Sequence, residues 1–162
     1  MEIKILSANH KRKEFSCGEA LLDRYLKNQV NQDIKKSLST CTVIVNENDL
    51  VLGYYTLSSS SVDKDSLPEN LSKKFPPSYV DLPCILLGRL AVDENFKREG
   101  IGSLLLLDAL NKYLNISKEI GILCVVVDPI NEKAIAFYKH YGFIYLPTSG
   151  KMMISIKTIE SL

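Results

Sequence analysis

The chain has 162 residues, a length that suits one domain with a hydrophobic core of ordinary size, and we expect a single domain over 1–162. Hydrophobic residues make up 46% and charged residues 24%, and these proportions argue against a disordered chain or a coiled coil. The 20 basic and 19 acidic side chains leave a formal charge of +1, which argues against a strongly cationic nucleic-acid binder but leaves room for a local basic patch.

The cysteines and the apolar runs indicate the cellular compartment in which the protein acts. The four cysteines are widely spread and form no Cys-x-x-Cys pair, so metal-ligand spacing is missing. We therefore expect free thiols, a reducing compartment and no bound metal. A basic run at 10–13 follows the first residues where a secretory signal would be apolar, and the longest apolar runs have only strand length. These features predict a cytoplasmic protein that does not enter a membrane.

The chain begins with a predicted strand and a predicted helix. Residues 3–6 have strand character, and Ser16 followed three residues later by Glu19 has the spacing of a capping box. Beyond this cap, leucine, tyrosine, valine and isoleucine side chains recur at helical spacing to about residue 36. We therefore predict a helix that begins after Ser16 and turns one apolar face to the core.

A hairpin and an irregular segment follow the helix. Two β-rich runs, at 40–45 and 50–61, flank four turn-forming residues, a pattern that predicts a β-hairpin. Four of the six prolines then lie between Pro68 and Pro83, with a short helical stretch near 69–74. We interpret 62–82 as a surface excursion within one domain.

The C-terminal half alternates strands and helices. An almost continuous apolar run at 84–92 is typical of a central strand that is buried on both faces. The elements predicted after it are a helix, a buried strand, a helix and two strands, over 101–116, 120–127, 131–141, 143–146 and 152–156.

A glycine-rich turn, Lys97-Arg98-Glu99-Gly100-Ile101-Gly102, joins the strand at 84–92 to the next helix. A helix N-terminus has unpaired N–H groups and a partial positive charge, and glycine lets an anion approach them, so the segment suits a phosphate or pyrophosphate. A plain loop that needs glycine to turn is the alternative. A Walker A string is missing, and the dinucleotide fingerprint would need a third glycine where Leu105 stands. Nucleotide hydrolysis and hydride transfer are therefore disfavoured.

Two motifs in this half resemble a known superfamily. Leu90-Ala91-Val92 followed by the glycine-rich turn resembles motif A of the GNAT N-acetyltransferases, Arg/Gln-x-x-Gly-x-Gly/Ala, with Lys97 at the first position. Asn131, Ala134, Phe137-Tyr138 and Gly142-Phe143 resemble the superfamily's motif B. The resemblance implies a mixed α/β (α+β) fold. Its mostly antiparallel sheet of six to seven strands would be splayed between 84–92 and 120–127 and flanked by about four helices.

The resemblance also implies where acetyl-CoA binds. The pantetheine arm would pair with the main chain of the strand, and the pyrophosphate would lie on the N–H groups of 98–103. The residues implied are Leu90, Ala91, Val92, Lys97, Arg98, Glu99, Gly100, Ile101, Gly102, Ser103 and Asn131. Lys97 and Arg98 have a second interpretation as a solvated basic loop, and Asn131 as an ordinary helix cap.

Tyr138 occupies the position at which many GNAT enzymes place a general acid for the departing thiolate. An unperturbed tyrosine has a pKa of about 10, so it holds its proton at neutral pH. The alternative is an aromatic residue that only packs. No general base stands out. An α-amine has a pKa of about 8, so a substantial fraction is neutral at physiological pH and needs no base.

Shorter matches along the whole chain resemble one branch of the superfamily. Phe15-Ser16-Cys17-Gly18, Leu22-Asp23-Arg24-Tyr25-Leu26, Gly53-Tyr54-Tyr55-Thr56-Leu57 and Leu87-Gly88-Arg89-Leu90 resemble the GNAT toxins of bacterial toxin–antitoxin pairs. Those enzymes acetylate the α-amine of aminoacyl-tRNA, are inhibited by a small DNA-binding antitoxin and are commonly dimers. The resemblance therefore implies an aminoacyl-tRNA acceptor, an antitoxin partner and a homodimer.

Arg89 is unusual because a charge within an apolar strand is costly unless it is paired. It either lines the acceptor side as a substrate-binding residue or forms a buried ion pair. A tRNA ligand also needs a basic face, for which the candidates are Lys11-Arg12-Lys13, Arg24, Lys35-Lys36 and Lys73-Lys74. Each doublet has an alternative interpretation as ordinary solvated surface. Two other functions stay open. One is a GNAT that acetylates a small-molecule or protein amine, and the other is a non-catalytic acetyl-CoA-binding module.

Overall fold

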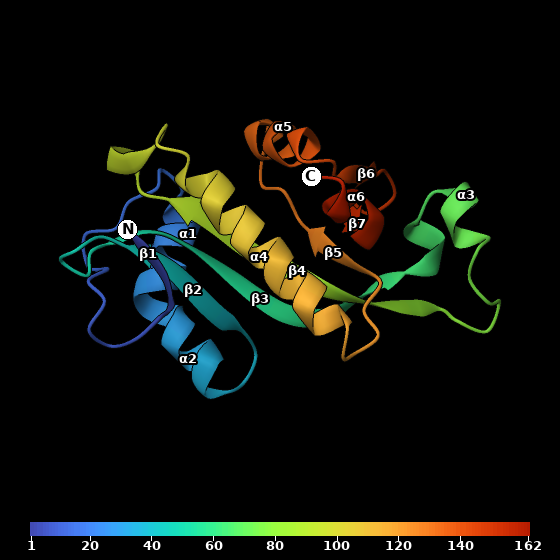
Figure 1. Cartoon of the computed structure of the whole chain (residues 1–162), viewed down its shortest axis with the longest axis horizontal. Helices are drawn as coiled ribbons and strands as arrows, with labels where there is room; N and C mark the ends of the chain where they lie inside the picture. Colours follow the sequence, from blue (N-terminus) through green and yellow to red (C-terminus); the bar gives the residue numbers. More distant parts are fainter. The chain divides into compact units, whose positions relative to one another are not determined.

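The computed structural model describes all residues from Met1 to Leu162. The strands are β1 (Glu2–Ile5), β2 (Thr40–Val45), β3 (Val51–Asp63), β4 (Asp81–Val92), β5 (Cys124–Val127), β6 (Ile144–Leu146) and β7 (Lys151–Ser155). The α-helices are α1 (Ala20–Arg24), α2 (Val30–Lys35), α3 (Glu69–Ser72), α4 (Ile101–Ser117), α5 (Glu132–His140) and α6 (Ile156–Glu160). Figure 1 labels these elements along the chain.

The strands form one sheet in the order β1-β2-β3-β4-β5-β7-β6. The pairs β1–β2, β2–β3, β5–β7 and β6–β7 are antiparallel, and β4–β5 is parallel. This mixed, mostly antiparallel sheet of seven strands confirms the predicted fold class. None of the helices combines the length and the apolar character that a membrane span needs.

The chain divides into two compact units. The first unit comprises Met1–Ser58 and Gly88–Ala109, and the second comprises Ser59–Leu87 and Leu110–Leu162. The elements β3, β4 and α4 contribute residues to both units. Each unit has its own cluster of buried apolar side chains, so the core of each can be described by itself.

In the first unit, α1, a π-helical turn and α2 follow one another without a break. The π-turn spans Tyr25–Gln29, and its Tyr25 and Leu26 are buried against the strand residues Val43 and Tyr54. An extra residue in one helical turn rotates the face that follows it. As a result Ile34, predicted to continue the apolar stripe, is 38% exposed.

The helical segment begins at Ala20, so the predicted capping box at Ser16 is wrong. Glu19 is the N-cap and makes no capping bond with its side chain. The N–H of Cys17 donates to Asp23 Oδ1 (2.9 Å), and the N–H of Ser16 donates to Asp93 Oδ2 (3.1 Å). Two aspartates thus satisfy the N–H groups before the helix.

Gly53 allows β3 to approach the start of α4. A Cβ at this position would lie 2.9 Å from the Ala91 carbonyl oxygen and 2.9 Å from Leu105 Cδ1. In addition, the Tyr55 hydroxyl donates to Asp108 Oδ2 (2.6 Å) and fastens the same strand to the helix. Glycine at this position therefore helps to fix where α4 begins.

In the second unit, the parallel pairing places Cys84–Leu87 of β4 opposite Cys124–Val127, and β4 continues to Val92. The strand β5 begins at Cys124, so the predicted start at residue 120 is wrong. Ile120 is 63% exposed, and the Ile122 carbonyl accepts the Tyr113 hydroxyl (3.1 Å) before the strand begins.

The chain closes with a helix that the sequence analysis did not predict. Residue Ile156, expected in the last strand, begins α6. The Ser155 hydroxyl oxygen accepts the N–H of Thr158 (3.3 Å), which is a helix N-cap. Gly142 has φ +98°, and a Cβ there would lie 2.7 Å from Thr158 Cγ2, so α6 packs against a turn that requires glycine.

Candidate functional site

Asp93 fixes the entry to the glycine-rich turn in the first unit. This carboxylate is 6% exposed, and its Oδ1 accepts the N–H of Asn95 (2.9 Å) while Oδ2 accepts that of Ser16 (3.1 Å). Its own N–H donates to the Leu52 carbonyl of β3 (2.8 Å), and the N–H of Glu94 donates to the Ser16 carbonyl (2.8 Å). The loop that leaves β4 is therefore held at a fixed position.

The turn itself has the backbone that an anion site needs. Arg98 (φ 71°) and Gly100 (φ 77°) are both left-handed, and the N–H of Leu104 donates to the Gly100 carbonyl (3.0 Å) where α4 begins. No atom lies within 4 Å of a Cβ built on Gly100, and residues 97–100 are exposed. Left-handed turns before a helix direct successive N–H groups outward and favour anions.

Lys97 has a structural contact that the sequence analysis did not foresee. Its Nζ donates to the Cys17 carbonyl (2.9 Å), so the ammonium ties the turn to the segment before α1. The neighbouring Gly18 has φ +94°, and a Cβ there would lie 2.7 Å from Glu94 Oε1. Glycine is therefore required where these two segments meet.

Arg89 lies over an aromatic ring in the first unit. Its Cζ is 3.4 Å from the centroid of the Tyr25 ring, and Tyr25 is stacked on Tyr54 at 6.5 Å. Burial and the bond from the Tyr25 hydroxyl to Asp33 (2.8 Å) raise the pKa of Tyr25 to about 12. A neutral aromatic face of this kind attracts a guanidinium and offsets part of its desolvation. The charge in the apolar strand is thus held by a cation–π contact.

In the second unit, Tyr138 is buried in the last turn of α5. It is 7% exposed, and its ring centroid lies 5.3 Å from that of Phe137 and 5.1 Å from that of Phe143. Burial raises the pKa of the Tyr138 phenol above its ordinary value, so the group stays protonated well beyond neutral pH. A buried phenol that keeps its proton can act as a donor.

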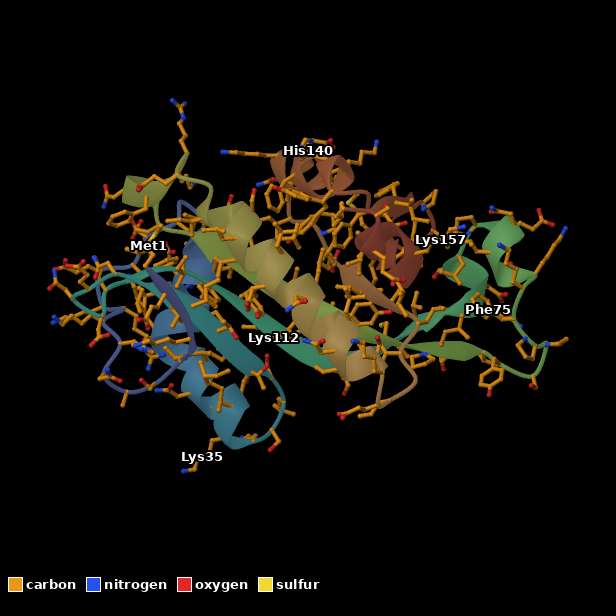
Figure 2. The ribbon with its side chains drawn as sticks, in the orientation of Figure 1. Met1, Lys35, Phe75, Lys112, His140 and Lys157 are labelled. Atoms are coloured by element: carbon orange, nitrogen blue, oxygen red, sulfur yellow. The ribbon has the colours of Figure 1, made fainter.

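Further polar side chains of the second unit lie at the two ends of α5 and directly after β5. Asn131 is the N-cap, and its Oδ1 accepts the N–H of Ala134 (2.9 Å), so the interpretation as a helix cap is confirmed. His140 ends the helix on the surface (Figure 2). Asp128 forms an ion pair with Lys151 (3.6 Å). No group of three or more His, Cys, Asp and Glu side chains is placed to hold a metal ion.

Known proteins match both motifs. Residues 37–145 match the family described as "Acetyltransferase (GNAT) domain". This chain belongs to the GNAT acetyltransferase family. The matched residues contain the glycine-rich turn and Tyr138, and the resemblance predicted from motifs A and B is confirmed.

Similarity to bacterial toxins extends over nearly the whole chain. A "tRNA-acetylating toxin" of Mycobacterium tuberculosis (strain ATCC 25618 / H37Rv) is 34% identical over 149 residues, which are 91% of this chain and 87% of the toxin. The predicted resemblance to GNAT toxins is therefore confirmed as a similarity of the full chain.

Solved structures of the toxin AtaT share the fold. AtaT complexed with acetyl-methionyl-tRNAfMet has a TM-score of 0.90 and 32% identity, covering 99% of this chain and 97% of AtaT. A tyrosine-to-phenylalanine mutant of AtaT, bound to the C-terminus of the antitoxin AtaR and acetyl-CoA, has a TM-score of 0.82 and 29% identity. That match covers 99% of this chain and 96% of the AtaT chain.

Proposed function

We propose that this chain is a toxin that transfers the acetyl group of acetyl-CoA to the α-amine of aminoacyl-tRNA and thereby stops translation. The observation that carries the proposal is the similarity, along nine tenths of the chain, to a protein named a tRNA-acetylating toxin. The AtaT complex with an acetylated aminoacyl-tRNA supports the same acceptor. We further propose that residues 1–162 act as one acetyltransferase domain.

Acetyl-CoA is the acetyl donor and supplies an activated thioester. The left-handed backbone of the exposed turn supports a pyrophosphate site on the N–H groups of Arg98, Glu99, Gly100, Ile101, Gly102 and Ser103, with Lys97 holding the turn in place. The main chain of Leu90, Ala91 and Val92 would bind the pantetheine arm, because β4 continues past the residues that pair with β5. The Asn131 side chain, whose Oδ1 already caps α5, would also form a hydrogen bond with the pantetheine arm.

Two features of the chemistry follow from the residues. Tyr138 holds a proton at its hydroxyl for the departing thiolate, because burial raises its pKa and keeps the phenol neutral. An α-amine has a pKa of about 8, so part of it is already nucleophilic near neutral pH, which removes the need for a dedicated base. Arg89, placed over Tyr25, is proposed to bind the acceptor.

The proposal includes partners. The AtaT structure with the C-terminus of its antitoxin supports an antitoxin partner for this chain, which we propose to be a small DNA-binding protein that inhibits it. A homodimer is supported by Leu104 and Leu107, which are 45% and 43% exposed on one face of α4 and would be covered in an assembly. An acceptor that takes part in translation also implies that the protein acts in the cytoplasm.

A purified translation system tests the proposed function. We expect protein synthesis to stop when the protein and acetyl-CoA are both added, and to continue when either is omitted, because the acetylated α-amine can no longer form a peptide bond. The contrary result has two parts. Protein synthesis would continue in the complete reaction, and in a separate reaction the enzyme would rapidly acetylate polyamines. Together these would show that its substrates are small-molecule amines.

A further inference from the structure

The first unit contains a basic pocket that the proposed chemistry leaves unused. Its volume is about 470 Å³, and it is lined by His10, Lys11, Arg12, Lys13, Lys27 and Asn28. Four of these six side chains are cationic and none is acidic. In a chain with a formal charge of only +1, such a cluster creates a local positive potential that attracts anions.

The fold builds this pocket by means of the π-turn. The N–H of Val30 donates to the Tyr25 carbonyl, five residues earlier, and the Leu26 carbonyl accepts Arg12 Nη1 (2.7 Å). Arg12 thereby ties residues 10–13 to the helical segment, whose turn supplies Lys27 and Asn28 to the same pocket. π-turns within α-helices occur frequently at functional sites.

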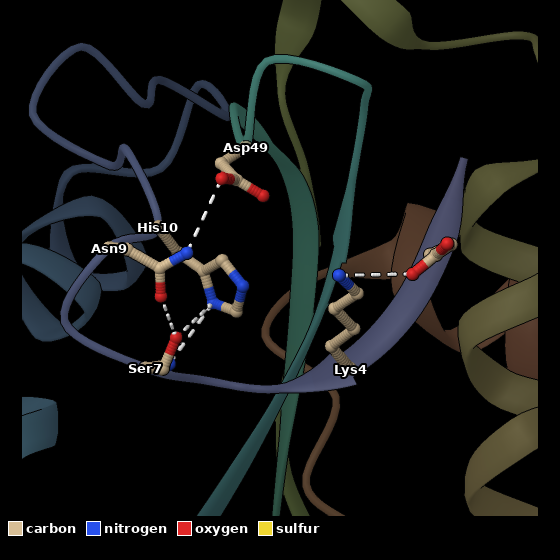
Figure 3. Close-up of polar contacts among 6 residues, drawn as sticks. Lys4, Ser7, Asn9, His10 and Asp49 are labelled. Carbon is tan, nitrogen blue, oxygen red and sulfur yellow. Dashed lines mark hydrogen bonds and ion pairs between the residues drawn. The ribbon is translucent and has the colours of Figure 1, made fainter.

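The backbone of Lys11, in the basic segment of the pocket, is bonded to the β2–β3 hairpin. The N–H of Lys11 donates to the Asp49 carbonyl (2.8 Å), and the Lys11 carbonyl accepts the N–H of Val51 (2.9 Å). Asn9 Nδ2 also donates to Asp49 Oδ2 (3.3 Å), a contact drawn in Figure 3. The basic residues therefore project from a backbone that is bonded on both sides.

His10 is a buried polar group that lines the pocket. It is 6% exposed, and its Nδ1 accepts the N–H of Ser7 (3.0 Å), as Figure 3 shows. Because Nδ1 is an acceptor, the neutral ring carries its proton on Nε2. In Figure 3 this second nitrogen faces away from Ser7, and both side-chain contacts of the His10 ring involve Nδ1. Nε2 is not among the buried side-chain atoms that lack a hydrogen-bond partner, and because His10 lines the pocket, its N–H can donate to an anion there.

We propose that this pocket binds a backbone phosphate of tRNA, with His10 Nε2 donating a hydrogen bond and Lys11, Lys13 and Lys27 supplying charge. The inference deepens the proposed function, on which it rests, by giving the acceptor a second point of attachment. The lining favours a phosphodiester over an acidic peptide, because it offers cations and N–H donors but no apolar residue for a side chain to pack against.

Direct binding of uncharged tRNA, measured by fluorescence anisotropy over a range of salt, tests the pocket. In the double variant Lys13→Gln/Lys27→Gln we expect the Kd for tRNA to rise about 10-fold and the salt dependence to become shallower, because fewer cations neutralise phosphates. The matched control is Lys118→Gln/Lys157→Gln, which removes the same charge from exposed positions of the second unit. An equal loss of affinity in both double variants, or none in the first, would overturn the proposal.

Two substitutions of His10 separate the donor from the structural bond. Asn at this position keeps an acceptor near the Ser7 N–H but is too short to place an N–H where Nε2 lies, whereas Gln places one there. We expect His10→Asn to weaken tRNA binding about 3- to 10-fold and His10→Gln to weaken it less, at similar melting temperatures. If both variants lose the same tRNA affinity and both have a lower melting temperature, His10 serves only the fold.

The same assay tests the pocket separately from the proposed function. It also tests whether the pocket binds the phosphates of tRNA or those of coenzyme A. Binding of uncharged tRNA requires no acetyl transfer, so pocket-dependent binding without acetylation of charged tRNA would reject the proposed function alone. We expect the KM for acetyl-CoA to be unchanged in Lys13→Gln/Lys27→Gln. A raised KM for acetyl-CoA with an unchanged Kd for tRNA would assign the pocket to coenzyme A and contradict the inference.

Discussion

Replacing Tyr138 with phenylalanine is expected to lower kcat about 10²- to 10⁴-fold, the usual loss when a general acid is removed. This loss corresponds to about 3–5 kcal/mol of transition-state stabilisation. The aromatic ring keeps its packing against Phe137 and Phe143, so the fold and acetyl-CoA affinity should stay close to wild type. Single-turnover kinetics combined with titration calorimetry would measure both effects.

The pH dependence of the wild-type enzyme gives a second readout for Tyr138. Because burial raises its pKa, the phenol stays protonated at pH values where an exposed tyrosine would ionise. We therefore expect kcat to rise as the acceptor α-amine loses its proton near about pH 8, and then to show no decline up to at least about pH 10, the ordinary pKa of tyrosine. Near-normal kcat in Tyr138→Phe would show that the residue only packs, and joint loss of turnover and acetyl-CoA binding would show that the hydroxyl holds the donor.

Replacing Gly102 with glutamate is expected to lower acetyl-CoA affinity about 10- to 100-fold, because it places a carboxylate at a helix start proposed to hold a pyrophosphate. Titration calorimetry with acetyl-CoA measures the change. The protein should remain folded, since Gly102 is partly exposed.

Gly121→Glu is a matched control for this substitution. Gly121 lies in the loop before β5, and no atom lies within 4 Å of a Cβ built there. The same change in charge and volume at Gly121 should leave acetyl-CoA affinity unaltered. Unchanged affinity in Gly102→Glu would remove the glycine-rich turn from the acetyl-CoA site.

The parts of the fold that the sequence predicted correctly are those encoded locally. The continuous apolar run at 84–92 became part of the long central strand β4, and the turn at 46–49 joins β2 to β3. Gly100, which the sequence placed in the glycine-rich turn, has φ 77°, a left-handed value that glycine adopts without steric cost. Local backbone preference is sufficient to identify such positions.

Contacts between distant segments could not be predicted in this way. Lys97 binds the Cys17 carbonyl 80 residues earlier in the chain, and Arg89 lies over Tyr25 because β4 and the π-turn pack together. The π-turn itself escaped detection because its residues keep ordinary helical composition, while the Leu26 carbonyl bonds to Arg12. The residues that line the basic pocket are brought together by this packing, so sequence spacing indicated only Lys11-Arg12-Lys13.

Mass spectrometry of aminoacyl-tRNA is the most direct test of the proposed function. A mixture of charged tRNAs is incubated with the protein and acetyl-CoA, digested with a nuclease, and analysed for the 3′-terminal aminoacyl-adenosine. We predict that at least one aminoacyl-adenosine gains the mass of one acetyl group on the α-amine of its amino acid, and that uncharged tRNA gains none. Unmodified aminoacyl-adenosines for every amino acid, from an enzyme that consumes acetyl-CoA with another amine in the same buffer, would contradict the account.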